Sequence, residues 1–144
     1  MKFLNLATLL LSLFATTSAL AVGKRQTAGL QIYVANAACL ESEDAITSTD
    51  PYIEITVDGQ TQRTQKVGDG TTFTIYGETL NFPSASPTSV LDIVAKDKDV
   101  LRDDTIGKAT VDLSKVDTTK PITVELKHLL GLANAGIVTI YVVQ

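Results

Sequence analysis

The sequence has little of the chemistry that cysteine and histidine provide, with one residue of each among its 144 residues. The single cysteine, Cys39, cannot form an internal disulfide, so the hydrophobic core must hold the fold together by itself. We expect Cys39 to be a small buried side chain, with an intermolecular disulfide or a reactive thiol as the alternative. Zinc and copper sites are not expected, because those metals bind through His and Cys.

The sequence also lacks the signatures of hydrolytic enzymes. It contains no Gly-x-Ser-x-Gly nucleophile elbow and no cysteine–histidine arrangement. His128 follows Lys127 at the end of an expected strand, which is typical of a surface histidine. The Asp and Glu residues of the loops are explained better as metal ligands than as general acids and bases. We therefore do not expect an enzyme.

Basic residues are few, with 12 Lys and Arg against 16 Asp and Glu and a net charge of −4. Three of the 12, Lys2, Lys24 and Arg25, lie in an N-terminal region that we expect to be removed, which leaves nine against 16 and a net charge of −7. A nucleic-acid-binding protein needs a basic face, so nucleic acid is not an expected partner. The acidic balance also opposes constitutive binding to anionic membranes unless a cation neutralises it.

The N-terminal region has the features of a secretory signal peptide. Lys2 gives a positive start, residues 4–20 form an interrupted apolar run, and Ala19 and Ala21 place small residues where signal peptidase cleaves. The run is too short and too interrupted to span a membrane. We expect a signal peptide at residues 1–21, a pro-segment at 22–25 and a single domain at 26–144.

Lys24-Arg25 resembles the dibasic site that kexin-like proteases cut in eukaryotic secretory pathways. The alternative is an ordinary basic pair in a flexible N-terminus. Cleavage there would leave a chain that starts at Gln26 and has the length of one domain with its own core. We therefore expect a secreted, extracellular monomer.

From residue 29 onward, short alternating segments separated by turn signals predict an all-β protein. Asp58-Gly59, between two such segments, is a strong signal for a two-residue hairpin. Residues 127–133 are the only stretch that could form a helix. The spacing predicts an eight-stranded antiparallel Greek-key β-sandwich. The expected strands cover residues 29–35, 52–57, 61–67, 72–82, 90–95, 106–113, 122–126 and 137–143.

Two acidic clusters lie between expected strands, at residues 41–50 and 97–104, with only Lys98 and Arg102 as basic residues among them. Carboxylates held close together repel one another unless a cation lies between them. Calcium suits such a cluster because it takes six to eight oxygen ligands in a loose geometry. An EF-hand is excluded because Arg102 and Lys108 stand where that loop needs a glycine and a glutamate. We expect Ca²⁺ as the cofactor.

The order of these segments resembles that of a C2 domain over residues 28–143. The matching pieces are Leu30-x-Ile32-x-Val34, Asp44 with Asp50-Pro51-Tyr52-Ile53, Arg63-Thr64-x-Lys66-Val67, and Asp97-x-Asp99 with Asp104-x-Ile106-Gly107. Two features depart from the family pattern: the third calcium loop is one residue shorter than in many members, and Tyr76 replaces the usual tryptophan. The resemblance implies a type II topology, in which a last strand at residues 136–143 brings both chain ends to one end of the sandwich.

The resemblance also implies which residues bind calcium. The ligands are Asp44 and Asp50 from the first loop and Asp97, Asp99 and Asp104 from the third. Because the third loop is short, Asp103 is an alternative to Asp104. The remaining alternative is a C2 sandwich whose acidic loops no longer bind metal.

Apolar residues occupy the tips of the same loops: Ile46 in the first loop, and Val100 and Leu101 in the third. The alternative is that these side chains pack into the sandwich. We expect them to insert into a membrane, where each contributes about 1.5–3 kcal/mol. Calcium would act as an electrostatic switch or a bridge to anionic head groups. Arg63 and Lys66 are too few basic residues to predict phosphoinositide specificity.

Together these features predict a secreted, calcium-binding C2 module that docks on phospholipid membranes in a calcium-dependent manner and stays peripherally associated with them. The alternative is a secreted protein-interaction C2 domain, such as an effector or a protein that binds a cell surface or wall, in which calcium is structural. Lipid binding measured with and without calcium separates the two.

Overall fold

The computed structural model describes residues 29–41, 49–128, 131 and 133–143. They form eight strands and one 3-10 helix, namely β1 (Leu30–Ala38), β2 (Pro51–Val57), β3 (Gln60–Arg63), β4 (Phe73–Phe82), β5 (Val90–Asp97), β6 (Asp104–Asp112), η1 (Leu113–Lys115), β7 (Ile122–Lys127) and β8 (Asn134–Val143). Among these described residues, no helix has the length and apolar character needed to cross a bilayer. The expected all-β architecture is confirmed.

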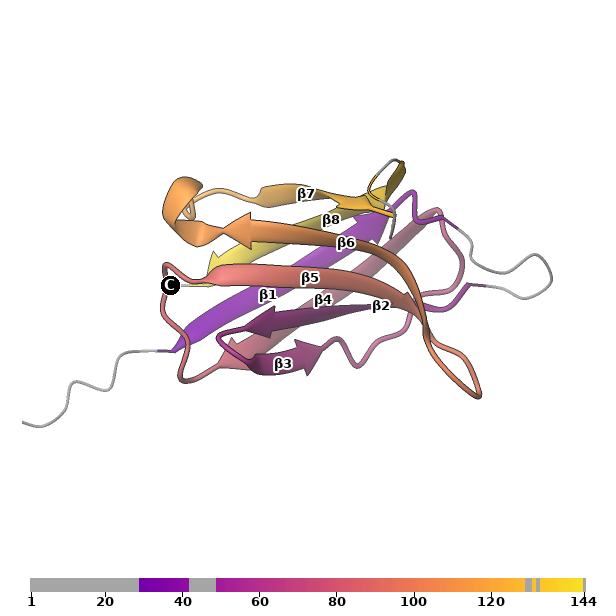
Figure 1. Ribbon diagram of the computed structural model, residues 1–144, viewed down its shortest axis with the longest axis horizontal. Coiled ribbons are helices and arrows are strands. Elements are labelled where there is room, and N and C mark those ends of the chain that lie inside the picture. The colour runs from indigo at the N-terminus through magenta and orange to yellow at the C-terminus, as the bar shows by residue number, and fades with distance from the viewer. Residues whose placement is uncertain (1–28, 42–48, 129–130, 132, 144) are drawn as a thin grey trace, which may run out of the picture.

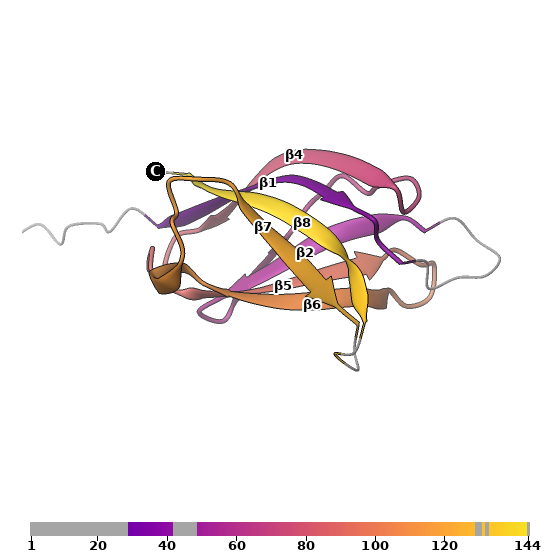
Figure 2. The ribbon, with the colours of Figure 1, turned by 90° about the horizontal axis from the view of Figure 1, so that it is seen from above.

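The strands follow the order β3-β2-β5-β6-β7-β8-β1-β4, and all neighbours are antiparallel. The connection between β6 and β7 is narrow, with Lys108 opposite Lys127 as its one register pair. The sheet folds over at this point, so that β3-β2-β5-β6 and β7-β8-β1-β4 stack as two layers (Figures 1 and 2). The result is the Greek-key sandwich that the strand spacing predicts.

Alternating residues of both layers form the core between them. In β5, Leu91 and Ile93 are fully buried whereas Val90 and Asp92 are exposed, as the two-residue period of a half-buried strand requires. The largest fully buried side chains are Phe82, Ile32, Ile53, Ile55, Leu91, Ile93, Ile106, Leu126, Ile140, Val34, Val57 and Val138.

Pairing of the first and last strands confirms the type II topology. β8 lies beside β1, with Gln31 opposite Val143, so the two described ends of the chain are neighbours (Figure 1, left). At the opposite end lie the end of β1, the start of β2 and the connections that follow β3 and β5 (Figure 1, right). We call this second end the loop end.

The hairpin between β2 and β3 forms as predicted, with φ angles of 47° at Asp58 and 77° at Gly59. β3 is shorter than expected and ends at Arg63. The Thr64 N–H still donates to the carbonyl of Ile53 at 2.9 Å, and beyond it the chain turns toward the start of β2, where Gly68 bonds Pro51. The suggested helix at 127–133 is wrong for the described residues there, since Lys127 ends β7 and Asn134 begins β8.

The expectation that Cys39 is buried is also wrong, because its side chain is exposed. Cys39 follows the last residue of β1 and has a φ of 53°, in the left-handed region. Its backbone N–H donates to the carbonyl of Thr72 at 3.1 Å, which fixes the chain as it leaves the sheet. The turned backbone directs the thiol to solvent.

Candidate functional site

The pairing of β2 with β5 joins the end of the first acidic loop to the start of the second. Pro51 lies opposite Asp97, and the backbone N–H of Asp50 donates to Asp97 Oδ1 at 2.7 Å. The N–H of Lys98 in turn donates to the carbonyl of Asp50 at 3.1 Å. Asp97 is buried, with 1% of its surface exposed. Two aspartates that are 47 residues apart in the sequence therefore share one corner of the loop end.

The hairpin between β5 and β6 adds a third aspartate to this corner. A bulge leaves Ile106 without a residue opposite it, since Ala95 faces Gly107 and Lys96 faces Thr105. The shift sets Asp104 directly opposite Asp97. Side chains of directly opposed residues project from the same face with Cβ atoms about 4.5–5.5 Å apart, where like charges destabilise a sheet.

The Asp103 carboxylate accepts hydrogen bonds from within the protein. The hydroxyl of Tyr52 donates to its Oδ2 at 2.7 Å, and the backbone N–H of Asp99 donates to its Oδ1 at 3.1 Å. These two bonds lower the pKa of Asp103, the Tyr52 bond being the larger cause. Burial, and then the bond to Asp103, raise the pKa of Tyr52 to about 12. Asp104, by contrast, lies opposite Asp97 in the ladder. Which of the two aspartates binds calcium stays a prediction.

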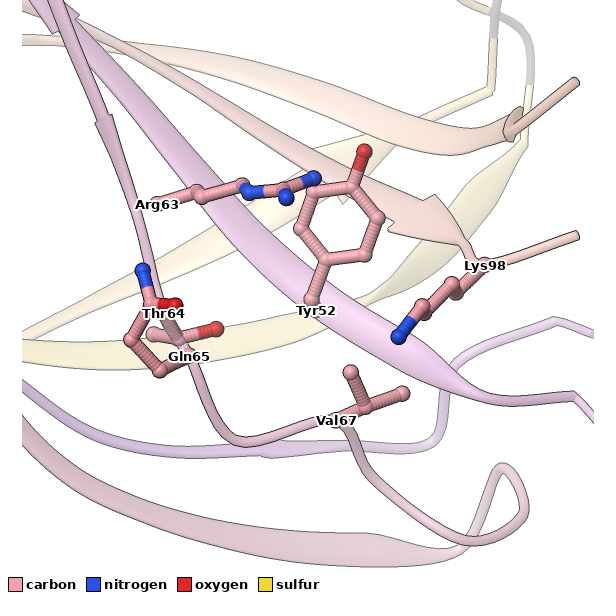
Figure 3. A pocket seen from close by; sticks show the side chains of 6 residues that line it. All are labelled: Tyr52, Arg63, Thr64, Gln65, Val67 and Lys98. Carbon is pink, nitrogen blue, oxygen red and sulfur yellow. The ribbon is translucent and has the colours of Figure 1, made fainter.

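A small hollow of about 80 Å³ lies beside Tyr52, where Arg63 and Lys98 approach the ring from two sides (Figure 3). The Arg63 guanidinium carbon is 5.3 Å from the centre of the Tyr52 ring, a cation–π arrangement. Arg63 also lowers the pKa of Asp103 electrostatically, after the two hydrogen bonds. Arg63 therefore already has an internal carboxylate nearby.

The tip of the hairpin is apolar and uncovered. Val100 is 101% exposed and Leu101 is 98% exposed, so the alternative that they pack into the sandwich is wrong. An open hollow of about 410 Å³ adjoins the tip, lined among others by Asp50, Asp99 and Val100. Acidic and fully exposed apolar side chains are thus next to each other at the loop end.

Several expected residues lie outside the part of the chain that the structure describes. They are Asp44, Ile46, Ala21, Lys24 and Arg25. Within the described part, no three His, Cys, Asp or Glu side chains come close enough to form a ready metal site. The donor set nevertheless suits calcium, since it consists of carboxylate oxygens from two loops around one corner.

Residues 64–72 support the corner in a way that the sequence analysis missed. The N–H of Gly68 donates to the carbonyl of Pro51 at 2.7 Å, and the N–H of Gly70 donates to that of Thr49 at 2.8 Å. The buried Tyr76 hydroxyl also donates to the Pro51 carbonyl at 2.7 Å. In the sequence, Gly68-Asp69-Gly70 indicates that the chain turns after β3. It does not indicate which strands residues 64–72 pack against.

The family model of the C2 domain matches residues 28–127. Among curated proteins, the chain is 35% identical over 89 residues to 16 kDa phloem protein 2 of Arabidopsis thaliana, a match that covers 60% of this chain and 60% of that protein. It is 32% identical over 93 residues to FT-interacting protein 7 of Oryza sativa subsp. japonica, over 64% of this chain and 12% of that protein. The match thus spans only part of each relative.

Solved structures share the fold at low identity. A single C2 domain of plant extended synaptotagmin 1 has a TM-score of 0.68 and 20% identity, covering 81% of this chain and 93% of that one. The calcium-bound pair of C2 domains of extended synaptotagmin 2 has a TM-score of 0.58 and 20% identity, covering 79% of this chain and 45% of that one. Human GIVD cytosolic phospholipase A2 has a TM-score of 0.58 and 23% identity, covering 78% of this chain and 16% of that one.

Proposed function

The chain belongs to the C2 domain family, and from that premise we propose that it is a secreted, non-catalytic module that binds Ca²⁺ and then docks on phospholipid membranes. One observation carries the proposal. Asp97 and Asp104, on facing strands, flank a hairpin whose tip residues Val100 and Leu101 are almost completely exposed. Ligand positions and an apolar tip on one short hairpin couple metal binding to membrane contact.

The residues that would hold the ion are Asp50, Asp97, Asp99 and Asp104, together with Asp44, which lies outside the described residues. When bound, Ca²⁺ would supply positive charge that offsets these carboxylates and open coordination positions for lipid phosphate oxygens. The hydrogen bond between Asp50 and Asp97 keeps the two loops adjacent. Tyr52 keeps Asp103 aside, so that the acidic corner is not enlarged by another carboxylate.

The apolar tip would add hydrophobic contact to this electrostatic step. Val100 and Leu101 each contribute about 1.5–3 kcal/mol when moved fully from water into lipid. In water, exposure of these apolar side chains is unfavourable in free energy, and contact with a partner removes that exposure. Charge would therefore control arrival at the membrane, and the tip would control the time spent there.

Secretion is proposed from the N-terminal sequence, with its apolar run at residues 4–20 and the Lys24-Arg25 pair. Outside the cell, calcium modules bind with dissociation constants on the order of 10⁻⁴–10⁻³ M. A site of that affinity would be largely loaded at all times. The regulated quantity would then be the supply of membrane, with anionic head groups preferred because of the bound charge.

The test is co-sedimentation of the mature chain with phosphatidylserine-containing vesicles, in calcium and in excess chelator. We expect pelleting only with calcium, and none for Asp99→Asn in either condition. Asp117→Asn, which removes an exposed acidic group beyond η1 at the end away from the loops, is the matched control and should pellet like the parent.

Two results would contradict the proposal. Equal pelleting in calcium and chelator would remove the calcium dependence. No pelleting in either condition, together with calcium binding by calorimetry, would support the alternative of a protein-interaction domain in which calcium is structural.

A further inference from the structure

Exposed apolar side chains are concentrated at one end of the molecule. Of the described large hydrophobic side chains, the four most exposed are Val100, Leu101, Ile75 and Phe73, the last two at 60% and 55%. All four belong to segments of the loop end, since β4 begins there at Phe73. The next most exposed, Val90, begins β5 at the opposite end and is 44% exposed.

Phe73 and Ile75 lie on the outer face of the β7-β8-β1-β4 layer. Their neighbours Thr74 and Tyr76 are buried, so the alternation of β4 directs Phe73 and Ile75 away from the core. β4 is also the last strand of the sheet, so these two side chains stand at its margin.

This pair is continuous with the proposed calcium corner. A hollow of about 360 Å³ is lined by Phe73, Ile75 and Lys66, and also by Val67 and Gly68. Val67 and Gly68 line the hollow that contains Asp50, Asp99 and Val100 as well. The two hollows therefore adjoin, and residues 66–68 form the ridge between the hairpin tip and the β4 pair.

We propose that Phe73 and Ile75, with Lys66 beside them, form a second membrane contact, so that the domain rests on the bilayer tilted toward the margin of β4. This inference rests on the proposed membrane function and names a further surface for it. Among the described residues that line the hollow, Lys66 is the one cation, and it suits a lipid phosphate above an apolar pair. Asp69 is the opposing charge in the same hollow.

The geometry allows both side chains to reach the lipid. Phe73 and Ile75 are two residues apart on one strand, hence about 7 Å apart along it. Apolar groups of interfacial proteins lie about 5–10 Å deep at the boundary of head groups and acyl chains. A modest tilt therefore suffices to lower both residues while the hairpin tip remains in contact.

A lipid surface fits this margin better than a further protein strand does. The Lys66 ammonium donates to the carbonyl of Ile75, and the Glu78 carboxylate accepts from the N–H groups of Gln65 and Lys66 at 2.7 Å each. Residues 65 and 66 thus cover part of the β4 edge, where a partner strand would need free backbone groups. A second copy of the chain is the competing occupant that an experiment must exclude.

Because the chain contains no tryptophan, a single introduced indole reports on its own position. We would prepare Phe73→Trp, Val100→Trp and Val90→Trp and add calcium with phosphatidylcholine–phosphatidylserine vesicles carrying brominated acyl chains. We expect a blue shift and quenching of the indole fluorescence for Phe73→Trp and Val100→Trp, and neither for Val90→Trp. A response of Val100→Trp alone would overturn the second contact and leave the proposed function standing.

Other outcomes are equally decisive. If none of the three variants shows a blue shift or quenching, both the second contact and the proposed membrane function are overturned. A shift of Phe73→Trp that needs no vesicles and grows with protein concentration would assign the pair to contact between copies. Phe73→Ser combined with Ile75→Ser should leave calcium affinity without lipid unchanged and speed vesicle release about tenfold, whereas Val90→Ser should not. Unchanged release from the double variant would overturn the inference.

Discussion

At the scale of single residues, two adjacent aspartates, Asp103 and Asp104, have different surroundings. Asp104 lies opposite Asp97 in the ladder, whereas both oxygens of Asp103 accept hydrogen bonds, from Tyr52 and from the backbone of Asp99. A carboxylate that already accepts two donors within the protein gives up those bonds if it turns to a metal ion. The two residues should therefore differ in their effect on calcium binding.

Isothermal calorimetry on three substitutions tests that difference. Asp99→Asn should remove most calcium affinity, by at least about tenfold, because carboxylate charge sets affinity in such sites. Asp104→Asn should weaken binding less, and Asp103→Asn should leave it nearly intact because Asp103 serves Tyr52 and Asp99. Circular dichroism should show the same fold for all three. Equal losses for Asp103→Asn and Asp104→Asn would identify Asp103 as a ligand.

At the scale of elements, residues 64–72 connect β3 to β4 and brace the start of β2. Gly68 is central, because a Cβ there would lie 2.5 Å from Thr74 Oγ1 and 2.8 Å from Pro51 Cγ. Its N–H also donates to the Pro51 carbonyl. The segment can therefore lie flat on β2 and β4 only with glycine at this position.

Gly68→Ala should destabilise the domain by about 1–3 kcal/mol, the usual cost of forcing an extra carbon into a packed site. Urea unfolding followed by circular dichroism measures the change. Asp69→Ala is the control, since its exposed neighbouring position should alter the free energy of unfolding by no more than about 0.5 kcal/mol. If Gly68→Ala and Asp69→Ala unfold at the same midpoint urea concentration, residues 64–72 do not pack as described.

The hairpin tip is the second element with a separable role. Replacing Val100 and Leu101 together by serine should leave calcium affinity nearly intact, because neither supplies a side-chain oxygen ligand. Dissociation from vesicles should accelerate by about tenfold or more, since hydrophobic insertion is removed. Stopped-flow release into a lipid trap without chelator measures this rate.

The matched variant is Val116→Ser, which removes an exposed apolar group beyond η1, at the end away from the loops. It should dissociate at the parental rate. If the double serine variant also leaves at the parental rate, the tip does not insert, and binding depends on calcium bridging or on a target other than lipid.

At the scale of the whole molecule, an acidic charge balance and the absence of an internal disulfide make a bound cation significant for stability. The 16 acidic residues exceed the 12 basic ones, and part of that excess lies at residues 97–104, where four aspartates accompany Lys98 and Arg102. A ligand that binds the folded state alone stabilises it in proportion to the logarithm of its concentration. Calcium should therefore raise the melting temperature.

At about ten times its dissociation constant, calcium should add about 1.4 kcal/mol and raise the melting temperature by roughly 4–8 °C. Differential scanning fluorimetry with calcium and with chelator measures the shift. Magnesium should give less, because it needs a stricter octahedral geometry. Asp99→Asn should abolish the calcium shift, and an unchanged parental melting temperature would contradict calcium binding to the folded domain.

The sequence by itself determined the features that depend on near neighbours in the chain. Alternation along each segment predicted the strands, and Asp58-Gly59 predicted the hairpin that the φ angles confirm. Runs of aspartate predicted acidic loops, and Val100-Leu101 between them predicted an exposed tip. These follow from local rules, because the side-chain period of a strand and the φ preference of a turn involve only adjacent residues.

Only the tertiary structure decided which distant groups meet. The bulge at Ile106 set Asp104 opposite Asp97, where a regular ladder would place Thr105, and a single residue of register changes which face a side chain occupies. The bracing by Gly68, the exposure of Cys39 and the outward pair on β4 likewise depend on how strands far apart in sequence pack together. Such contacts depend on strand register and on the packing of the two layers. The apolar–polar alternation within one strand does not specify which residues of other strands it will meet.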